Sequence, residues 1–431
     1  MNNTQVIQPD LTLTEEGFRR GVQIAIEPQG RIVAVGGNLD AAARKLPGRA
    51  LLPGMINAHS HAFQRALRGH GEVFGAGGGS FWTWREQMYD LVERMDEQTL
   101  YDVSARAYRE MLSAGITTVG EFHYLHHDHS GRSFALDEVV LRAAADSGIR
   151  IVLLSVLYRA GGLGQPLSGP QKQFGSDSLD EYWKQLAHLK SIVDPTIQSL
   201  GVAAHSIRAV AIKELQALHE EATRRGLIFH MHLEEQPGEI EACLSRHGKR
   251  PMALICGELS LDAGFTAVHC THTAKEEMET FLAAGANVCI CPLTEANLGD
   301  GIPDIGGILE NGGTICLGTD SNARISFTEE MRWLEYTQRL MRQRRGVCVD
   351  TRGSCAGKLW EMATINGARA LGLKAGAIQP GHVADLVVVD IEAESLAGAT
   401  EQTLLDAFIF GSGREAITDV CVGGKWLEVD S

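Results

Sequence analysis

Short apolar segments alternate with longer amphipathic segments through most of the chain. The amphipathic segments have the spacing of helices, and several apolar segments follow a helix-ending glycine, as in SAGITTV and RRGLIF. Parallel strands joined by helices produce this alternation. The eight apolar segments are residues 51–61, 117–124, 149–156, 199–206, 227–235, 265–272, 287–294 and 314–321.

Eight strand and helix units are the number that closes a barrel. We therefore expect an α/β fold in which residues 51–378 form a metal-dependent (β/α)8 TIM-type barrel, the catalytic domain. An open, doubly wound sheet is the competing architecture. An open sheet does not require polar residues at the ends of nearly all its strands, but this sequence carries polar residues there.

Both ends of the chain show strand patterns without helices between them. Residues 1–50 contain VIQPDLTLT and VQIAIEPQGRIVAVGG, and residues 379–431 contain ADLVVVDIE, DAFIFGS and AITDVCVGGKWLEV. Neither flank is long enough to bury a sheet alone. We expect residues 1–50 and 379–431 to join as one small β-sandwich domain beside the barrel.

The carboxyl ends of the expected barrel strands carry histidines and carboxylates. His59 and His61 end the first strand, and their spacing of two points both imidazoles to the same side. A single His-x-His is more often two polar residues at a strand end. Four strand ends of this kind, which meet at one face of a barrel, instead predict a metal site. The other candidates are His230, His232 and Glu235 on the fifth strand, His269 and His272 on the sixth, and Asp320 on the eighth.

The donor set indicates which metal to expect. Three neutral imidazoles and one carboxylate suit zinc better than calcium or magnesium, although iron and manganese also accept this set. The expected fourth strand, SLGVAAHSIR, has no lysine that could bridge a second ion, so we expect one ion per chain. Spacing does not decide between His230 and His232, because both face the same way.

A hydrolytic mechanism follows from these residue types. Zinc lowers the pKa of a bound water to about 7. Asp320 can orient that water and share its proton, and Glu235 can carry protons to a leaving nitrogen. His269 can polarise the electrophile.

The motifs around these residues resemble a known superfamily. PGMINAHSH, HMHLEEQ, VHCTH and LGTDS resemble the deaminase branch of the amidohydrolase superfamily, and GHVADLVVVD resembles its returning sandwich strand. Within that branch, HAFQRALRG, FWTWRE, GEFHYLHH, HSIRAV and TDSNARISFTEEMRWLEYTQRL resemble the formimidoylglutamate deiminases. The resemblance covers nearly the whole chain. It implies hydrolysis of N-formimino-L-glutamate to N-formyl-L-glutamate and ammonia, a step of histidine degradation, by a homodimer.

The resemblance also assigns roles to individual residues. It implies one zinc ion held by His59, His61, His232 and Asp320, with Glu235, His269 and Asp320 as catalytic residues. It implies substrate contacts from Gln64, Arg85, Tyr124, His205 and Arg208. Guanidinium groups bind carboxylates bidentately, which suits a small dianionic amidine substrate.

The substrate residues have other interpretations from sequence alone. Arg85 and Arg208 could be solvated or could pair with Glu86 or another acid, and Tyr124 could belong to the core. Arg324, near the last expected ligand, is a further candidate for a carboxylate partner.

Three other segments carry chemistry-bearing residues. The histidines at 123, 126, 127 and 129 could suggest a second metal, but we interpret them mostly as a polar loop after the second strand. The glycine-rich segment 71–81 lacks the ending of a phosphate loop, and we expect either a mobile lid over the barrel mouth or a long disordered turn. Cys289 and Cys291 face one side of the seventh strand and are expected in the core.

Composition restricts the partners and the compartment. The 431 residues carry a formal net charge of -15, which disfavours nucleic acid and anionic membranes but not a small anion held by local arginines. Nine scattered cysteines form no secreted-type framework, and the start, MNNTQVIQPDLTLT, lacks a signal-peptide pattern. No uncharged apolar stretch has spanning length. We expect a cytoplasmic enzyme.

Two other functions are compatible with parts of this pattern. A related zinc aminohydrolase acting on a purine, pterin or adenosyl substrate would share the metal site, but aromatic stacking should replace the arginine forks. A non-catalytic barrel paralogue acting as a binding protein would be expected to lack metal ligands, and here the set is complete.

Overall fold

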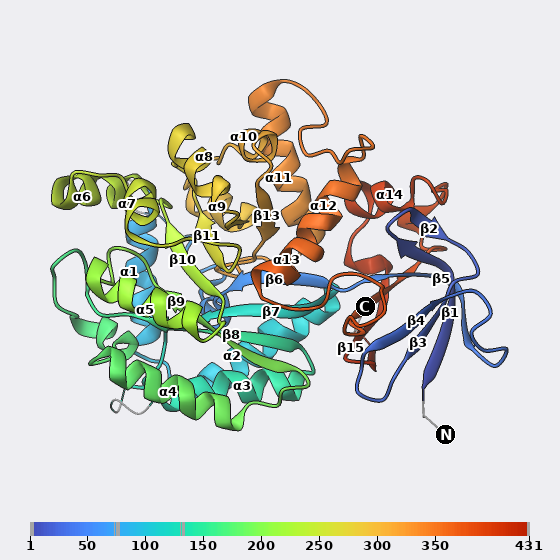
Figure 1. The fold of residues 1–431 in the computed structure, drawn as a ribbon, viewed down its shortest axis with the longest axis horizontal. Helices are drawn as coiled ribbons and strands as arrows, with labels where there is room; N and C mark the ends of the chain where they lie inside the picture. The colour runs from blue at the N-terminus through green and yellow to red at the C-terminus, as the bar shows by residue number, and fades with distance from the viewer. Residues whose placement is uncertain (1–3, 73, 75–77, 130, 132–133, 429–431) are drawn as a thin grey trace.

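The computed structural model describes residues 4–72, 74, 78–129, 131 and 134–428. A barrel surrounded by helices lies beside a sheet that combines the blue N-terminal and red C-terminal strands (Figure 1). None of the helices in these residues combines the length and the apolar character needed to cross a membrane.

Eight parallel strands form the barrel, as the sequence predicted. They follow one another in sequence order around the sheet, and a bridge between Ser60 and Asp320 brings the first and last strands together. Each of the eight predicted segments overlaps one of these strands. The strands are β6 (Met55–Ser60), β7 (Ile116–His123), β8 (Arg150–Leu157), β9 (Gln198–Ala204), β10 (Phe229–Leu233), β11 (Phe265–His269), β12 (Asn287–Ile290) and β13 (Thr314–Leu317).

The first predicted barrel segment divides at a glycine. Residues 51–53 end strand β5 (Arg44–Pro53) of the other sheet, and the barrel strand begins at Met55. A side chain at Gly54 would collide with the side chain of Thr117. The chain therefore passes between the two sheets at a residue that needs no Cβ.

Helices follow the barrel strands and bury one face each against them. In α2 (Glu97–Ser113), Leu100, Tyr108 and Met111 are fully buried, and the Asp96 side chain caps the first turn by accepting from Thr99 N at 2.8 Å. The other helices of the barrel region are α1 (Phe81–Val92), α3 (Ala135–Ser147), α4 (Leu179–Ile192), α5 (Ile212–Arg224), α6 (Pro237–His247), α7 (Pro251–Glu258), α8 (Lys275–Ala283), α9 (Pro292–Leu298), α10 (Ile305–Glu310), α11 (Phe327–Arg342), α12 (Cys355–Ala363) and α13 (Ile365–Ala370).

The two ends of the chain join in one mixed sheet, which confirms the expected small β-domain. Its strand order is β16-β15-β14-β5-β1-β3-β4, with β2 paired to β1, and the antiparallel pair of β14 and β5 connects the two termini. The residue limits 1–50 and 379–431 stay a prediction. The strands besides β5 are β1 (Gln5–Thr14), β2 (Gly17–Arg19), β3 (Gln23–Ile26), β4 (Ile32–Gly36), β14 (Leu386–Asp390), β15 (Ile417–Val422) and β16 (Lys425–Glu428).

One predicted strand is wrong. The segment DAFIFGS lies in helix α14 (Leu404–Gly411), which buries Leu404, Phe408 and Ile409. Phe408 meets the ring of Trp360 on α12, with ring centroids 6.1 Å apart. Apolar residues four and five positions apart form one face of a helix, and a short apolar run does not reveal which element it forms.

A buried ion pair fastens the barrel to the terminal sheet. Arg150 on β8 donates from Nε to Asp385 Oδ2 at 2.6 Å and from Nη2 to Asp385 Oδ1 at 3.0 Å. Asp385, just before β14, also accepts from Gly423 N at 2.7 Å. Both charged side chains are buried, so each depends on the other.

Asp385→Asn should destabilise the protein by about 3–5 kcal/mol, because it leaves the buried Arg150 guanidinium without its counter-charge. Urea denaturation followed by circular dichroism measures the effect. Glu221→Gln, which removes ion pairs to the exposed Arg224 and Arg225, is the control and should shift the midpoint much less. Equal midpoints for the two variants would contradict a fastening role for the Arg150 pair.

Candidate active site

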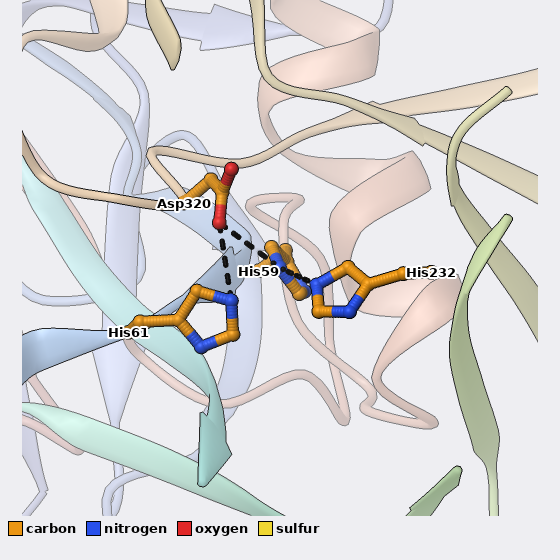
Figure 2. Close-up of side chains that lie close together, drawn as sticks. All are labelled: His59, His61, His232 and Asp320. Atoms are coloured by element: carbon orange, nitrogen blue, oxygen red, sulfur yellow. Dashed lines mark hydrogen bonds and ion pairs between the residues drawn. The ribbon is translucent and has the colours of Figure 1, made fainter. Parts of the chain in front are cut away.

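Four side chains from three strand ends meet at one point in the barrel mouth (Figure 2). His59 and His61 come from the end of β6, His232 from β10, and Asp320 from the turn after β13. Asp320 Oδ1 lies 3.1 Å from His61 Nε2 and 3.4 Å from His59 Nε2. The Nε2 atoms of His59 and His232 are 3.1 Å apart. All four side chains are buried.

These distances fit the ligands of a single metal ion. Ligand atoms at about 2.1 Å from a tetrahedral ion lie roughly 3.4 Å from one another. His61 Nδ1 donates to Phe122 O at 2.9 Å and His232 Nδ1 donates to His205 O at 3.0 Å, which turns both Nε2 lone pairs toward the centre. Burial lowers the pKa of His59 to about 3 and that of His232 well below its ordinary value, so these two imidazoles are neutral donors. The donor set therefore fits a divalent cation.

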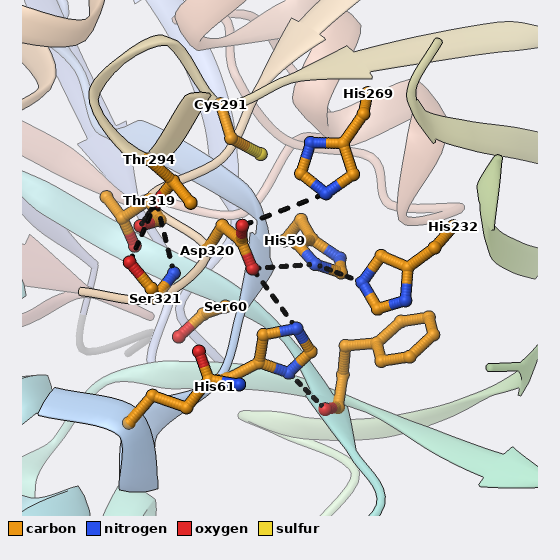
Figure 3. A network of polar contacts seen from close by, with 12 residues as sticks. His59, Ser60, His61, His232, His269, Cys291, Thr294, Thr319, Asp320 and Ser321 are labelled. Carbon is orange, nitrogen blue, oxygen red and sulfur yellow. Dashed lines mark hydrogen bonds and ion pairs between the residues drawn. The ribbon is translucent and has the colours of Figure 1, made fainter. Parts of the chain in front are cut away.

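Strained backbone and an asparagine network hold Asp320 in place. Its φ of 44° is in the left-handed region, which a non-glycine residue adopts only when its surroundings enforce it. Asn322 donates from Nδ2 to the carbonyls of His61 at 3.0 Å and Asp320 at 3.1 Å, and Thr319 N donates to Asn57 Oδ1 at 3.0 Å. Figure 3 shows the same turn from its other neighbours, where Ser321 N donates to Thr294 Oγ1 at 3.2 Å. Asn57 and Asn322 were not among the predicted site residues, because no sequence motif marks an asparagine whose side chain hydrogen-bonds to distant backbone groups.

The expected catalytic residues His269 and Glu235 lie beside the metal ligands. His269 Nε2 is 3.8 Å from Asp320 Oδ2 and 3.9 Å from Glu235 Oε1. Its Nδ1 lies 3.3 Å from Glu295 Oε1, a contact that the sequence did not predict. Burial disfavours the charged imidazole, but Glu235, Glu295 and Asp320 outweigh it and raise the pKa of His269 to about 10. A cation bound by Asp320 opposes that rise. Burial raises the pKa of Glu235, which favours its protonated form.

A cavity of about 280 Å³ opens onto these residues. Aromatic side chains form much of its wall, and the polar groups converge from several strand ends. It brings together the five side chains predicted to contact substrate, whose roles stay a prediction. They are Gln64, Arg85, Tyr124, His205 and Arg208.

The polar residues of the cavity are held in different ways. Gln64 Nε2 donates to Tyr124 Oη at 2.8 Å. Arg208 Nη2 lies 3.8 Å from Glu235 Oε2, so this guanidinium faces the catalytic carboxyl group. Arg85 Nε donates to Tyr89 Oη at 2.6 Å. Arg208 thus pairs with an acid, whereas Arg85 is held through Nε by a phenol.

Two other candidates lie away from this centre. His230, buried on β10, donates from Nε2 to Ala370 O at 2.8 Å and is not one of the four clustered donors. The structure thus resolves the ambiguity between His230 and His232. Arg324 pairs with Glu329 outside the residues that line the cavity, so its proposed role as a carboxylate partner has no support.

The histidines after β7 divide into buried and exposed groups. His123 and His126 lie against Asp137 of α3, and His129 is exposed. His126 uses both ring nitrogens, contacting Val156 O at 2.8 Å and Asp137 Oδ1 at 2.7 Å. Burial opposes a charged imidazole, but Asp137 outweighs it and raises the pKa of His126. These three groups lie close enough to hold an ion, but Asp137 already has His126 as a hydrogen-bond partner without one.

Two further predictions concern the cysteines Cys289 and Cys291 and the glycine-rich segment 71–81. Cys289 and Cys291 are buried in a small core cluster, as expected. Burial raises the pKa of Cys291 well above its ordinary value, which keeps the thiol neutral. Residues 73 and 75–77 of the predicted lid lie outside the described residues, whereas Phe81 begins α1 and lines the cavity.

His232→Gln should weaken metal binding by more than the roughly 100-fold that loss of an outer-shell partner costs, because an amide is a poor ligand for this kind of site. His230→Gln on the same strand is the matched control and should retain one divalent ion per chain. Metal content after dialysis, measured by mass spectrometry, compares the two. If both variants retain metal equally, His232 is not a ligand.

Comparisons with known proteins agree with this geometry. A model of the amidohydrolase family matches residues 50–427. Formimidoylglutamate deiminase of Pseudomonas aeruginosa is 38% identical over 424 residues, covering 97% of this chain and 93% of that protein. The crystal structure of an amidohydrolase from Brucella melitensis has a TM-score of 0.87 at 33% identity, covering 98% of this chain and 94% of that chain.

A zinc-bound adenosine deaminase from Xanthomonas campestris has a TM-score of 0.81 at 25% identity, covering 99% of this chain and 93% of that chain. The matched proteins thus include a deiminase and a deaminase of the same architecture. The chain belongs to the amidohydrolase family and is a metal-dependent hydrolase of carbon–nitrogen bonds.

Proposed function

We propose that this protein hydrolyses N-formimino-L-glutamate to N-formyl-L-glutamate and ammonia with one zinc ion. The observation that carries the proposal is a single cavity that contains the metal-ligand cluster, a carboxyl group with a raised pKa and two arginines. The first two features serve hydrolysis of a carbon–nitrogen bond, and the arginines suit a substrate with two carboxylates. Such a reaction belongs to histidine degradation.

The residues around the cluster have distinct tasks in this reaction. A zinc ion held by the four donors would lower the pKa of a water molecule to about 7. Asp320 orients the attacking water and accepts its proton on the oxygen that faces His269 Nε2, 3.8 Å away. Glu235, whose pKa burial raises, donates a proton to the nitrogen that leaves as ammonia. Water adds its oxygen to the formimino carbon, and the carbon–nitrogen bond breaks.

The two arginines would bind the ends of the substrate. Each presents a guanidinium to the cavity, and a fork of two N–H groups matches the geometry of a carboxylate. Gln64 and Tyr124, hydrogen-bonded to each other beside His61, would contact the formimino end. A formamidine without carboxylate groups lacks the partners that these two arginines require.

An aminohydrolase acting on an adenosyl, purine or pterin ring is the second candidate. Two observations favour it: the aromatic wall of the cavity, which includes Trp82, Trp84 and Phe174, and the similarity to an adenosine deaminase. The cationic side chain of Arg85 in the same cavity counts against it, because a neutral ring leaves this guanidinium without a counter-charge.

A substrate panel monitored for ammonia tests the assignment. The zinc-loaded protein should release ammonia from N-formimino-L-glutamate at least about 100-fold faster, in kcat/KM, than from adenosine, S-adenosylhomocysteine or a pterin, because two charge-assisted contacts are worth roughly 3 kcal/mol or more. Faster release from a ring substrate would establish the second candidate. No release from any compound would favour a non-catalytic binding protein.

Arg208→Met should lower kcat/KM for N-formimino-L-glutamate by roughly 100-fold, because it removes a charged hydrogen-bond donor worth about 3 kcal/mol. Metal content should not change, since Arg208 is not a ligand. Steady-state kinetics provide the measurement. Arg106→Met, at an exposed position on α2, is the control and should match the wild type. Unchanged kinetics in Arg208→Met would remove this residue from the site.

A further inference from the structure

The two arginines of the cavity have different electrostatic surroundings. Arg208 lies 3.8 Å from Glu235, and the nearby Glu239 carboxyl group also stabilises its charged form. No carboxylate among the described residues lies within ion-pair distance of Arg85. Its Nε donates instead to a neutral phenol, Tyr89 Oη, at 2.6 Å. The positive charge of Arg85 is therefore uncompensated by the protein.

Tyr89 connects α1 to the segment that follows β8. Its hydroxyl oxygen accepts a second hydrogen bond, from Gln171 Nε2 at 3.0 Å. Gln171 is buried in the short 3-10 helix η2 (Gly169–Phe174), where its Nε2 also donates to Gly161 O at 3.2 Å and its Oε1 accepts from Ser168 N at 3.1 Å. A phenol oxygen has two lone pairs, and these two donors use both of them. Tyr89 is thus fixed from two sides.

The same arrangement fixes the orientation of the guanidinium. Arg85 Cζ lies 5.2 Å from the ring centroid of Tyr89 and 5.6 Å from that of Trp82, so aromatic faces flank the cation. With Nε occupied, Nη1 and Nη2 have no hydrogen-bond partner among the described residues. Arg85 lines the cavity, so these two groups are available to a ligand.

We propose that Tyr89 is a positioning residue that sets the specificity of the site for an anionic substrate. It holds Arg85 through Nε and leaves the two Nη groups to bind one substrate carboxylate, an inference that rests on the proposed function. A glutamate or aspartate in its place would hold the arginine equally well but would cancel its charge. A neutral acceptor keeps that charge for the ligand, whose carboxylate supplies the missing counter-charge.

Tyr89→Phe tests this role because it removes the hydroxyl and keeps the ring. The KM for N-formimino-L-glutamate should rise by about 10- to 100-fold, the cost of misplacing one charged hydrogen-bond donor, while kcat changes by less than about twofold. Metal content and the thermal unfolding midpoint should match the wild type. Tyr101→Phe is the matched control, since its hydroxyl donates to Asp146 outside the cavity, at 2.8 Å. An unchanged KM in Tyr89→Phe would overturn the proposal.

A double-mutant cycle separates positioning from a general structural effect. If Tyr89 acts through Arg85, Tyr89→Phe should have no further effect on KM in an Arg85→Met background. Equal effects of Tyr89→Phe with and without Arg85 would show that Tyr89 acts independently, which would also overturn the proposal.

Binding of glutarate provides a test of the role of Tyr89 that does not depend on turnover. Calorimetry should show that the zinc-loaded wild type binds this dicarboxylate at least about 10-fold more tightly than Tyr89→Phe does. If glutarate binds as expected but N-formimino-L-glutamate releases no ammonia, the proposed function is contradicted and the role of Tyr89 still holds. Equal binding of glutarate by the wild type and Tyr89→Phe would contradict the role of Tyr89, whichever reaction the protein catalyses.

Discussion

A cluster of buried lone pairs that requires a cation is the constraint on which the rest of the structure depends. The Nε2 atoms of His59 and His232 lie 3.1 Å apart and an Asp320 oxygen lies beside them, all shielded from water. Neutral nitrogens facing one another at this distance repel unless a proton or a metal lies between them. The outer hydrogen bonds of His61 and His232 to backbone carbonyls fix this orientation before any ligand arrives.

Holding such a cluster requires backbone that ordinary strands do not supply. The left-handed residues Glu234, His269, Asp320 and Asn322 all lie where barrel strands end, so local strain is concentrated around the site. Hydrogen bonds from Asn322 and to Asn57 offset the strain of the turn after β13, and they also link that turn to β6. The same hydrogen bonds therefore join the first and last barrel strands and position a metal ligand.

Charge is divided unequally around the cavity. On one side, Glu235, Glu295 and Asp320 surround His269 and favour its charged imidazolium. On the other side, Arg85 faces a neutral phenol and keeps its full charge. This local positive charge stands out against a whole chain whose net charge is -15.

The sequence alone determined the barrel, the terminal β-domain and the identity of most site residues, because periodicity and strand-end chemistry are local properties. Strand spacing did not distinguish His230 from His232, which face the same way on one strand, and only the family resemblance favoured His232. The sequence also misassigned residues 406–412, a run too short to reveal its period. The roles of Asn57, Tyr89, Gln171 and Glu295 were decided by tertiary structure only. Each has a hydrogen-bond partner distant in sequence, and such pairings exist only once the chain has folded into the barrel.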